Sequence, residues 1–95
     1  MSLGWHAARK LRRGLDGLAR VLAGEALTAA RALDLRDTAP APGTGAVVAA
    51  LREVVEGPGP DRYLAPEIEA AVGLVVSGAL VTAAESVTGP LPPNL

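Results

Sequence analysis

Apolar side chains recur along the first third of the chain at helical spacing. Successive members of the series follow one another at steps of three and four residues, which places them on one face of a 3.6-residue helix. The members are Leu11, Leu15, Leu18, Leu22, Ala26, Ala29 and Leu33. From residue 21 the apolar surface widens into an Ala- and Leu-rich stretch. The pattern predicts one long helix over about residues 3–36, covered on most sides by other protein.

The predicted helix begins with a cluster of cations. Arg9, Lys10, Arg12 and Arg13 precede its first acid, Asp16. Helix N-termini favour acids, because their unpaired amides carry partial positive charge. We therefore expect a helix that continues upstream of residue 1 in a longer protein. A helix that begins near residue 7 is the alternative.

A second helix is predicted over about residues 44–56. A Pro-rich connector, residues 37–43, separates it from the first helix because proline cannot continue a helix. Thr44 is its expected N-cap. Its apolar face is formed by Val47, Leu51, Val54 and Val55.

A third helix is predicted over about residues 66–88, after a Gly- and Pro-containing connector at 57–65. Pro66 suits a first helical turn, and Gly89 with Pro90 marks the end. Small residues within it, at Gly73, Ser77, Gly78 and Thr82, allow another helix to approach closely. The tail, residues 89–95, is expected to be irregular.

These elements predict an all-α fold for residues 1–95: one long helix and two further helices in a hairpin or bundle. Aromatic residues make up only 2% of the chain and apolar residues 49%. A chain of this size buries only roughly 60–68% of its unfolded surface. We therefore expect oligomerisation, or contact with further protein, to complete the fold. The surfaces expected to be buried in an oligomer contain Leu11, Leu15, Leu18, Leu22, Val72, Val76 and Leu80.

Charge and composition exclude several classes of protein. Residues 1–20 carry five Lys/Arg and one Asp, but they lack the interleaved aromatic or glycine-rich features of a nucleic-acid interface. The uncharged run over residues 70–84 is shorter than the roughly 20 residues that cross a bilayer. There are 0 cysteines, so neither disulfides nor thiolate metal sites are available. We expect no nucleic-acid or membrane partner and a cytoplasmic location.

The chain carries no constellation of residues that runs a reaction unaided. His6 is the only histidine, which leaves little material for a triad or a metal cluster. Glu67 and Glu69 are two residues apart on a helix and point to different sides. Ser77 lies in an apolar helical stretch and does not form a nucleophile elbow. We predict no catalytic, cofactor-binding or metal-binding residue.

Four segments, in order, resemble one enzyme family. Residues 2–10, Ser-Leu-Gly-Trp-His-Ala-Ala-Arg-Lys, are similar to the helix that follows the acidic active-site motif of the histidine/phenylalanine ammonia-lyase family. Residues 21–36, 42–45 and 61–71 resemble the turns and helix starts that come next in that family. The resemblance spans nearly the whole chain, and the short C-terminal region favours the histidine branch.

The resemblance implies the C-terminal part of a mostly helical, tetrameric enzyme that eliminates ammonia from an amino acid. That family uses an imidazolone formed from an internal Ala-Ser-Gly, which this chain lacks, so no cofactor is expected here. No catalytic position carries over, and Tyr63 is interpreted as a packing residue. We therefore expect packing and subunit contacts within a homo-oligomer or with the rest of a lyase. The alternatives are a stand-alone helical interaction module and a fragment of a bacterial aromatic amino-acid lyase or aminomutase.

Overall fold

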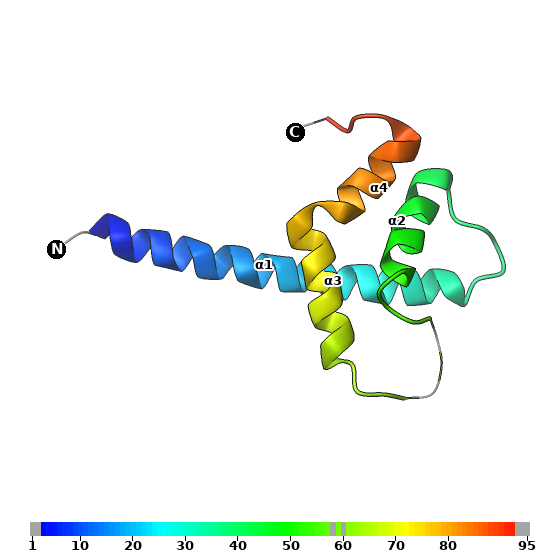
Figure 1. Cartoon of the computed structure of the whole chain (residues 1–95), viewed down its shortest axis with the longest axis horizontal. Coiled ribbons are helices and arrows are strands. Elements are labelled where there is room, and N and C mark those ends of the chain that lie inside the picture. The colour runs from blue at the N-terminus through cyan, green and yellow to red at the C-terminus, as the bar shows by residue number, and fades with distance from the viewer. Residues whose placement is uncertain (1–2, 58, 60, 93–95) are drawn as a thin grey trace.

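All regular structure among the described residues is helical. The computed structural model describes residues 3–57, 59 and 61–92, and within them it has four helices and no strand. The helices are α1 (Leu3–Asp34), α2 (Pro42–Arg52), α3 (Ala65–Ser77) and α4 (Ala79–Thr88), as Figure 1 shows. The all-α prediction is confirmed. Residues 89–92 have no regular structure, and residues 93–95 of the predicted irregular tail lie outside the described residues.

Helix α1 is the long axis of the molecule. Its 32 residues span about 48 Å at 1.5 Å per residue. The N-terminal half projects from the body formed by the other helices and the C-terminal half of α1 (Figure 1). The radius of gyration is 15.9 Å, whereas a compact domain of this length has about 12 Å. The chain is therefore a small body with a helical arm.

The core lies where α3 crosses the C-terminal half of α1. It consists of Ala23, Ala30, Leu51, Val55 and Ala71. Three of the five are alanines, whose small side chains allow the two helix backbones to approach closely. The leucines of α1 that we expect to be buried by further protein, Leu11, Leu15, Leu18 and Leu22, are exposed within this chain. The face of α1 that packs within the chain carries Ala19, Ala23 and Ala30 and lies about a quarter-turn away.

The third predicted helix is two helices. The chain bends by 60° between α3 and α4. Gly78 lies at the bend with φ +80°, a left-handed conformation that glycine adopts without steric cost. The prediction of one helix over 66–88 is therefore wrong at residue 78. The break turns α4 back so that it packs along α2.

Helix α2 starts earlier than predicted. Pro42 occupies its first turn and Ala41 the cap position, without a side-chain hydrogen bond. The prediction of Thr44 as N-cap is wrong, because the fixed φ of proline already begins the helix two residues before it. After Arg52 a turn, instead of a further helical turn, carries Val55 into the core.

Among the described residues, no single helix is long and apolar enough to cross a membrane. The bent pair α3 and α4 passes that test only when its two helices are taken together, by length and composition.

Candidate functional site

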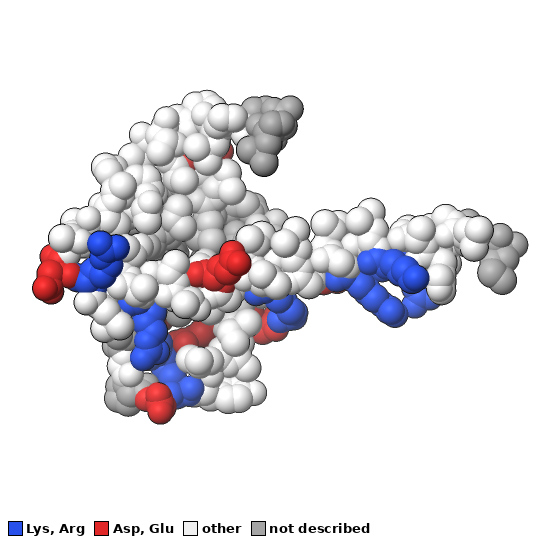
Figure 2. Space-filling view, turned by 180° about the vertical axis from the view of Figure 1, so that it is seen from behind, with Lys and Arg blue, Asp and Glu red and all other residues white. Residues whose placement is uncertain are grey.

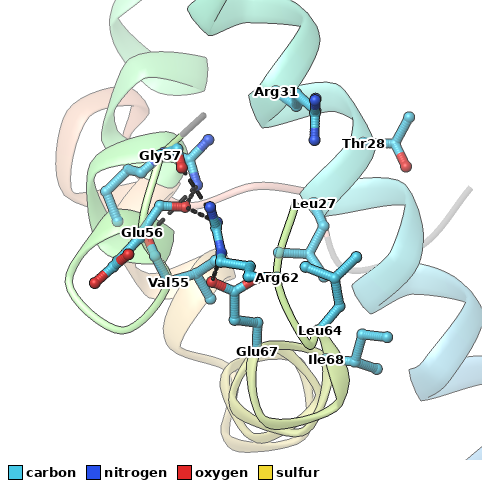
Figure 3. A pocket seen from close by; sticks show the side chains of 11 residues that line it. Leu27, Thr28, Arg31, Val55, Glu56, Gly57, Arg62, Leu64, Glu67 and Ile68 are labelled. Carbon is cyan, nitrogen blue, oxygen red and sulfur yellow. Dashed lines mark hydrogen bonds and ion pairs between the residues drawn. The ribbon is translucent and has the colours of Figure 1, made fainter. Parts of the chain in front are cut away.

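A cavity of about 200 Å³ lies between α1, the turn after α2 and the start of α3. One wall is apolar and contains Leu27, Leu64 and Ile68 (Figure 3). The opposite side contains charged side chains and backbone carbonyls. The lining residues on that side are Arg52, Glu56, Gly57, Arg62 and Glu67.

Arg62 links the connector to α3. Its Nε donates to Oε1 of Glu67 at 2.7 Å, and one terminal nitrogen donates to the carbonyls of Glu56 at 3.0 Å and Gly57 at 3.1 Å (Figure 3). The Glu67 carboxylate is 16% exposed and the Arg62 side chain 31%, so the pair is partly shielded from water. The guanidinium therefore holds the connector against the first turn of α3.

Arg52 holds the other side of the same turn. One terminal nitrogen donates to the carbonyl of Glu56 at 3.1 Å, and the other pairs with the Asp34 carboxylate at the end of α1. Its Nε is buried and has no hydrogen-bond partner among the described residues. We name Arg52 and Arg62 the arginine clamp, because together they join α1, the turn after α2 and α3.

The cavity contains acids but no general base or nucleophile in position. Glu67 is bonded to Arg62, while Glu69 reaches the other side of α3 and pairs with Arg20. The two carboxylates thus point apart, as their spacing predicts. Within the part of the chain that the structure describes, no group of three His, Cys, Asp or Glu is placed to hold a metal ion. The side chains of Arg52, Arg62 and Glu67 in the cavity thus make structural contacts.

The remaining candidates lie apart from the cavity. His6 is exposed near the start of α1. The Ser77 hydroxyl donates to the Leu74 carbonyl at 3.3 Å, at the C-terminal end of α3. Residues 76–78 are Val-Ser-Gly and end in the bend at Gly78, so they do not fit an imidazolone that is formed from Ala-Ser-Gly.

The interpretation of Tyr63 as a packing residue is wrong. Its side chain is 81% exposed. The neighbouring Arg62 turns inward to Glu67 and the two carbonyls, which leaves Tyr63 on the outside of the connector.

Four exposed leucines lie along one face of α1. Leu11, Leu15, Leu18 and Leu22 are 65%, 53%, 53% and 42% exposed, and we name them the leucine seam. At 3.6 residues per turn they lie within roughly 60° of arc, a narrow stripe of the kind that packs against one other helix. Lys and Arg side chains gather on the same arm, whereas both signs of charge occur on the body (Figure 2).

The junction between arm and body carries an ion pair. Arg20 donates to Oε1 of Glu69 at 2.6 Å, across the crossing of α1 and α3. The hydrogen bond and the negative charge of Glu69 raise the pKa of Arg20. Both side chains are more than half exposed, so the pair orients the crossing more than it stabilises it.

Sequence reasoning did not identify the arginine clamp. The signal available for Arg62 was its place in a Gly- and Pro-containing connector, five residues before Glu67. The Arg52–Asp34 contact joins residues 18 apart in the sequence, and no local pattern indicates it.

Comparison with known proteins identifies similar sequences. The sequence model described as aromatic amino acid lyase matches residues 1–53. The histidine ammonia-lyase of Streptomyces coelicolor is 59% identical over 93 residues, and those of Streptomyces avermitilis and Symbiobacterium thermophilum are 56% and 49% identical over 93 and 92. Each match covers 96% of this chain and 18% of the relative, so the chain spans under a fifth of these relatives' length. No solved structure matches the chain.

Proposed function

The chain belongs to the aromatic amino acid lyase family, and we propose that it is the C-terminal helical segment of a histidine ammonia-lyase-like enzyme. The parent enzyme would eliminate ammonia from L-histidine to give urocanate in the cytoplasm, as a step of histidine catabolism. This segment would contribute packing and subunit contacts and no catalysis by itself. The single observation that carries the proposal is the identity of 56–59% to three histidine ammonia-lyases over almost the whole chain.

The exposed leucine seam supports the packing role. An isolated helix shorter than about 12–15 residues is only marginally stable in water. The half of α1 before residue 19 is little longer than this and has no buried residue to stabilise it. Four exposed leucines at helical spacing form the apolar contact surface that such a helix needs. In the enzyme, we propose, the leucine seam packs against other helices.

The chemistry of the chain supports an inactive isolated segment. The sequence has one histidine, no cysteine and no Ala-Ser-Gly. The carboxylates of Glu67 and Glu69, and that of Asp34 beside the cavity, are each bonded to an arginine. The purified chain is therefore expected to produce no urocanate from histidine.

The decisive experiment is a chimaera. Residues 1–95 replace the matching segment of the Streptomyces coelicolor histidine ammonia-lyase, to which the chain is 59% identical over 93 residues. We expect the chimaera to form urocanate, measured by its ultraviolet absorbance, while the chain alone does not. A folded chimaera without activity, or turnover by the chain alone, would contradict the proposal. Activity towards tyrosine or phenylalanine but not histidine would favour the alternative of a bacterial aromatic amino-acid lyase.

A further inference from the structure

Two charged residues of the cavity between α1 and α3 take no part in the arginine clamp. Arg31 of α1 lines the cavity, is exposed and makes no ion pair among the described residues. Glu56 also lines it, but its carboxylate points away from the apolar wall (Figure 3). The nearby carboxylates of Asp34 and Glu67 are each bonded to an arginine of the clamp. Arg31 thus gives the cavity a positive charge that no bonded carboxylate offsets.

The apolar wall of the cavity lies next to this charge. Leu27 is four residues before Arg31 on α1, so the two side chains share one face of the helix. Leu64 and Ile68 face Leu27 from the start of α3 (Figure 3). Leu64 is 49% exposed, so part of this wall is open to water in the isolated chain. The cavity therefore offers an unpaired cation beside an uncovered apolar surface.

The charge of Arg31 restricts what can cover the cavity. The volume of about 200 Å³ is several times the roughly 30 Å³ of one water molecule, so a single bound water does not fill it. A cation that loses its water without gaining an anion is strongly disfavoured. A group that covers the apolar wall must therefore bring a negative charge to Arg31. The chain spans only 18% of the length of its relatives, so a larger lyase has further segments that can supply such a group.

We propose that the cavity is a docking site for a carboxylate side chain and an adjoining apolar side chain, both supplied by the part of the lyase outside this chain. The inference rests on the proposed function, which places the chain within a longer enzyme, and it names the chemistry of one contact. The planar guanidinium of Arg31 pairs with the two carboxylate oxygens. The apolar side chain covers Leu27, Leu64 and Ile68.

The first test offers the chain alone a small probe of the same chemistry. The probe is 4-methylpentanoate, which carries one carboxylate on a branched apolar body, and 4-methylpentanamide is its uncharged match. We expect the carboxylate to bind with a dissociation constant of about 1 mM and to shift the amide NMR signals of residues 27–31 and 64–68. The uncharged match should bind roughly tenfold more weakly, because it cannot form charge-assisted hydrogen bonds. Equal binding of the two, or no saturable binding of the carboxylate, would overturn the proposal.

The second test removes the unpaired charge. We expect Arg31→Gln to weaken the binding of 4-methylpentanoate roughly tenfold. The matched control is Arg36→Gln, which removes the same charge at an exposed residue outside the cavity and should leave binding unchanged. Both arginines are exposed, so circular dichroism should show the same helix content for the two variants. Equal weakening by both substitutions would mean a general attraction of the anion to positive charge and would overturn the role of Arg31.

The third test asks whether the rest of the enzyme fills the cavity. In the chimaera the docked carboxylate should exclude the probe, so Arg31→Gln should not change probe binding, measured by saturation-transfer NMR. The same substitution should lower the melting temperature of the chimaera more than Arg36→Gln does, because it leaves the docked carboxylate unpaired. Probe binding to the chimaera that depends on Arg31, or equal melting temperatures of the two variants, would overturn the docking. The first two tests need only this chain, so their failure is distinguishable from an inactive chimaera.

Discussion

The two halves of α1 have the same secondary structure but different support. In the second half, Ala19, Ala23 and Ala30 are buried against the body, while in the first half no residue is buried. The fully buried positions of the packed half are all alanines, whose small side chains allow α3 to cross closely. The exposed face of α1 carries the leucine seam, and none of its members is buried within the chain. Residue size thus differs between the packed and the exposed face of one helix.

The largest effect is expected from truncating a core side chain that packs against the buried half of α1. Leu51 of α2 is 1% exposed and packs in the cluster that includes Ala23 and Ala30. Leu51→Ala should lower the free energy of unfolding by about 2–5 kcal/mol, since it removes buried methyl groups and leaves a cavity. Urea denaturation followed by circular dichroism measures this. The control is Leu35→Ala, at a site that is 71% exposed. It should change the free energy of unfolding by less than about 0.5 kcal/mol.

The second prediction tests whether residue size matters only in the packed half. Ala23 is 0% exposed at the crossing with α3. Ala23→Leu should lower the free energy of unfolding by about 1–3 kcal/mol, because the added carbon atoms force α1 and α3 apart. Ala8→Leu makes the same change on the exposed arm and should be nearly neutral. If urea denaturation gave equal changes in the free energy of unfolding for the two substitutions, residue size would matter equally in both halves of α1.

The third prediction sharpens the comparison on the arm. Gly14 and Gly17 lie within α1, and a Cβ at either position would meet no atom within 4 Å. Replacing both with alanine should stabilise the arm helix by about 0.5–1 kcal/mol each, because alanine loses less backbone entropy in a helix. Slower amide hydrogen exchange over residues 8–20 measures this. Gly59→Ala, in the connector, is the control and should leave exchange on the arm unchanged.

The smallest effect is expected at the junction of the two halves. Glu69→Gln removes the charge that pairs with Arg20, and both side chains are largely exposed. The midpoint of urea denaturation should fall slightly at low ionic strength, and the difference should vanish in 1 M salt, where exposed charges are screened within about 3 Å. A large loss that persists in high salt would show that the pair is a main support of the crossing.

Much of the helical organisation was predictable from local patterns. The predicted helix over 3–36 corresponds to α1 at Leu3–Asp34, because apolar periodicity extends over many turns and is hard to produce otherwise. Pro66 located the start of α3 to within one residue, whereas Pro42, which the sequence analysis assigns to the connector, lies in the first turn of α2. Gly78 was recognised only as a small residue, since nothing local distinguishes a helical glycine from one with a positive φ.

Of the two candidate sites, one was predicted from the sequence and one was not. The leucine seam was predicted from its spacing, and its members are exposed as a contact surface for further protein requires. The arginine clamp was not predicted, because the contacts of Arg52 and Arg62 bring together the end of α1, the turn after α2 and the start of α3. Such contacts depend on how three separate elements meet.

By itself the sequence determined the all-α class, the length of α1, the family and the absence of an Ala-Ser-Gly, since each depends on residue identity or local periodicity. The tertiary structure alone decided which face of α1 is packed. Leucine and alanine both suit an apolar helix face, so periodicity cannot choose between them. The close crossing of α3 buries the alanines at residues 19, 23 and 30, and it leaves the leucine seam exposed.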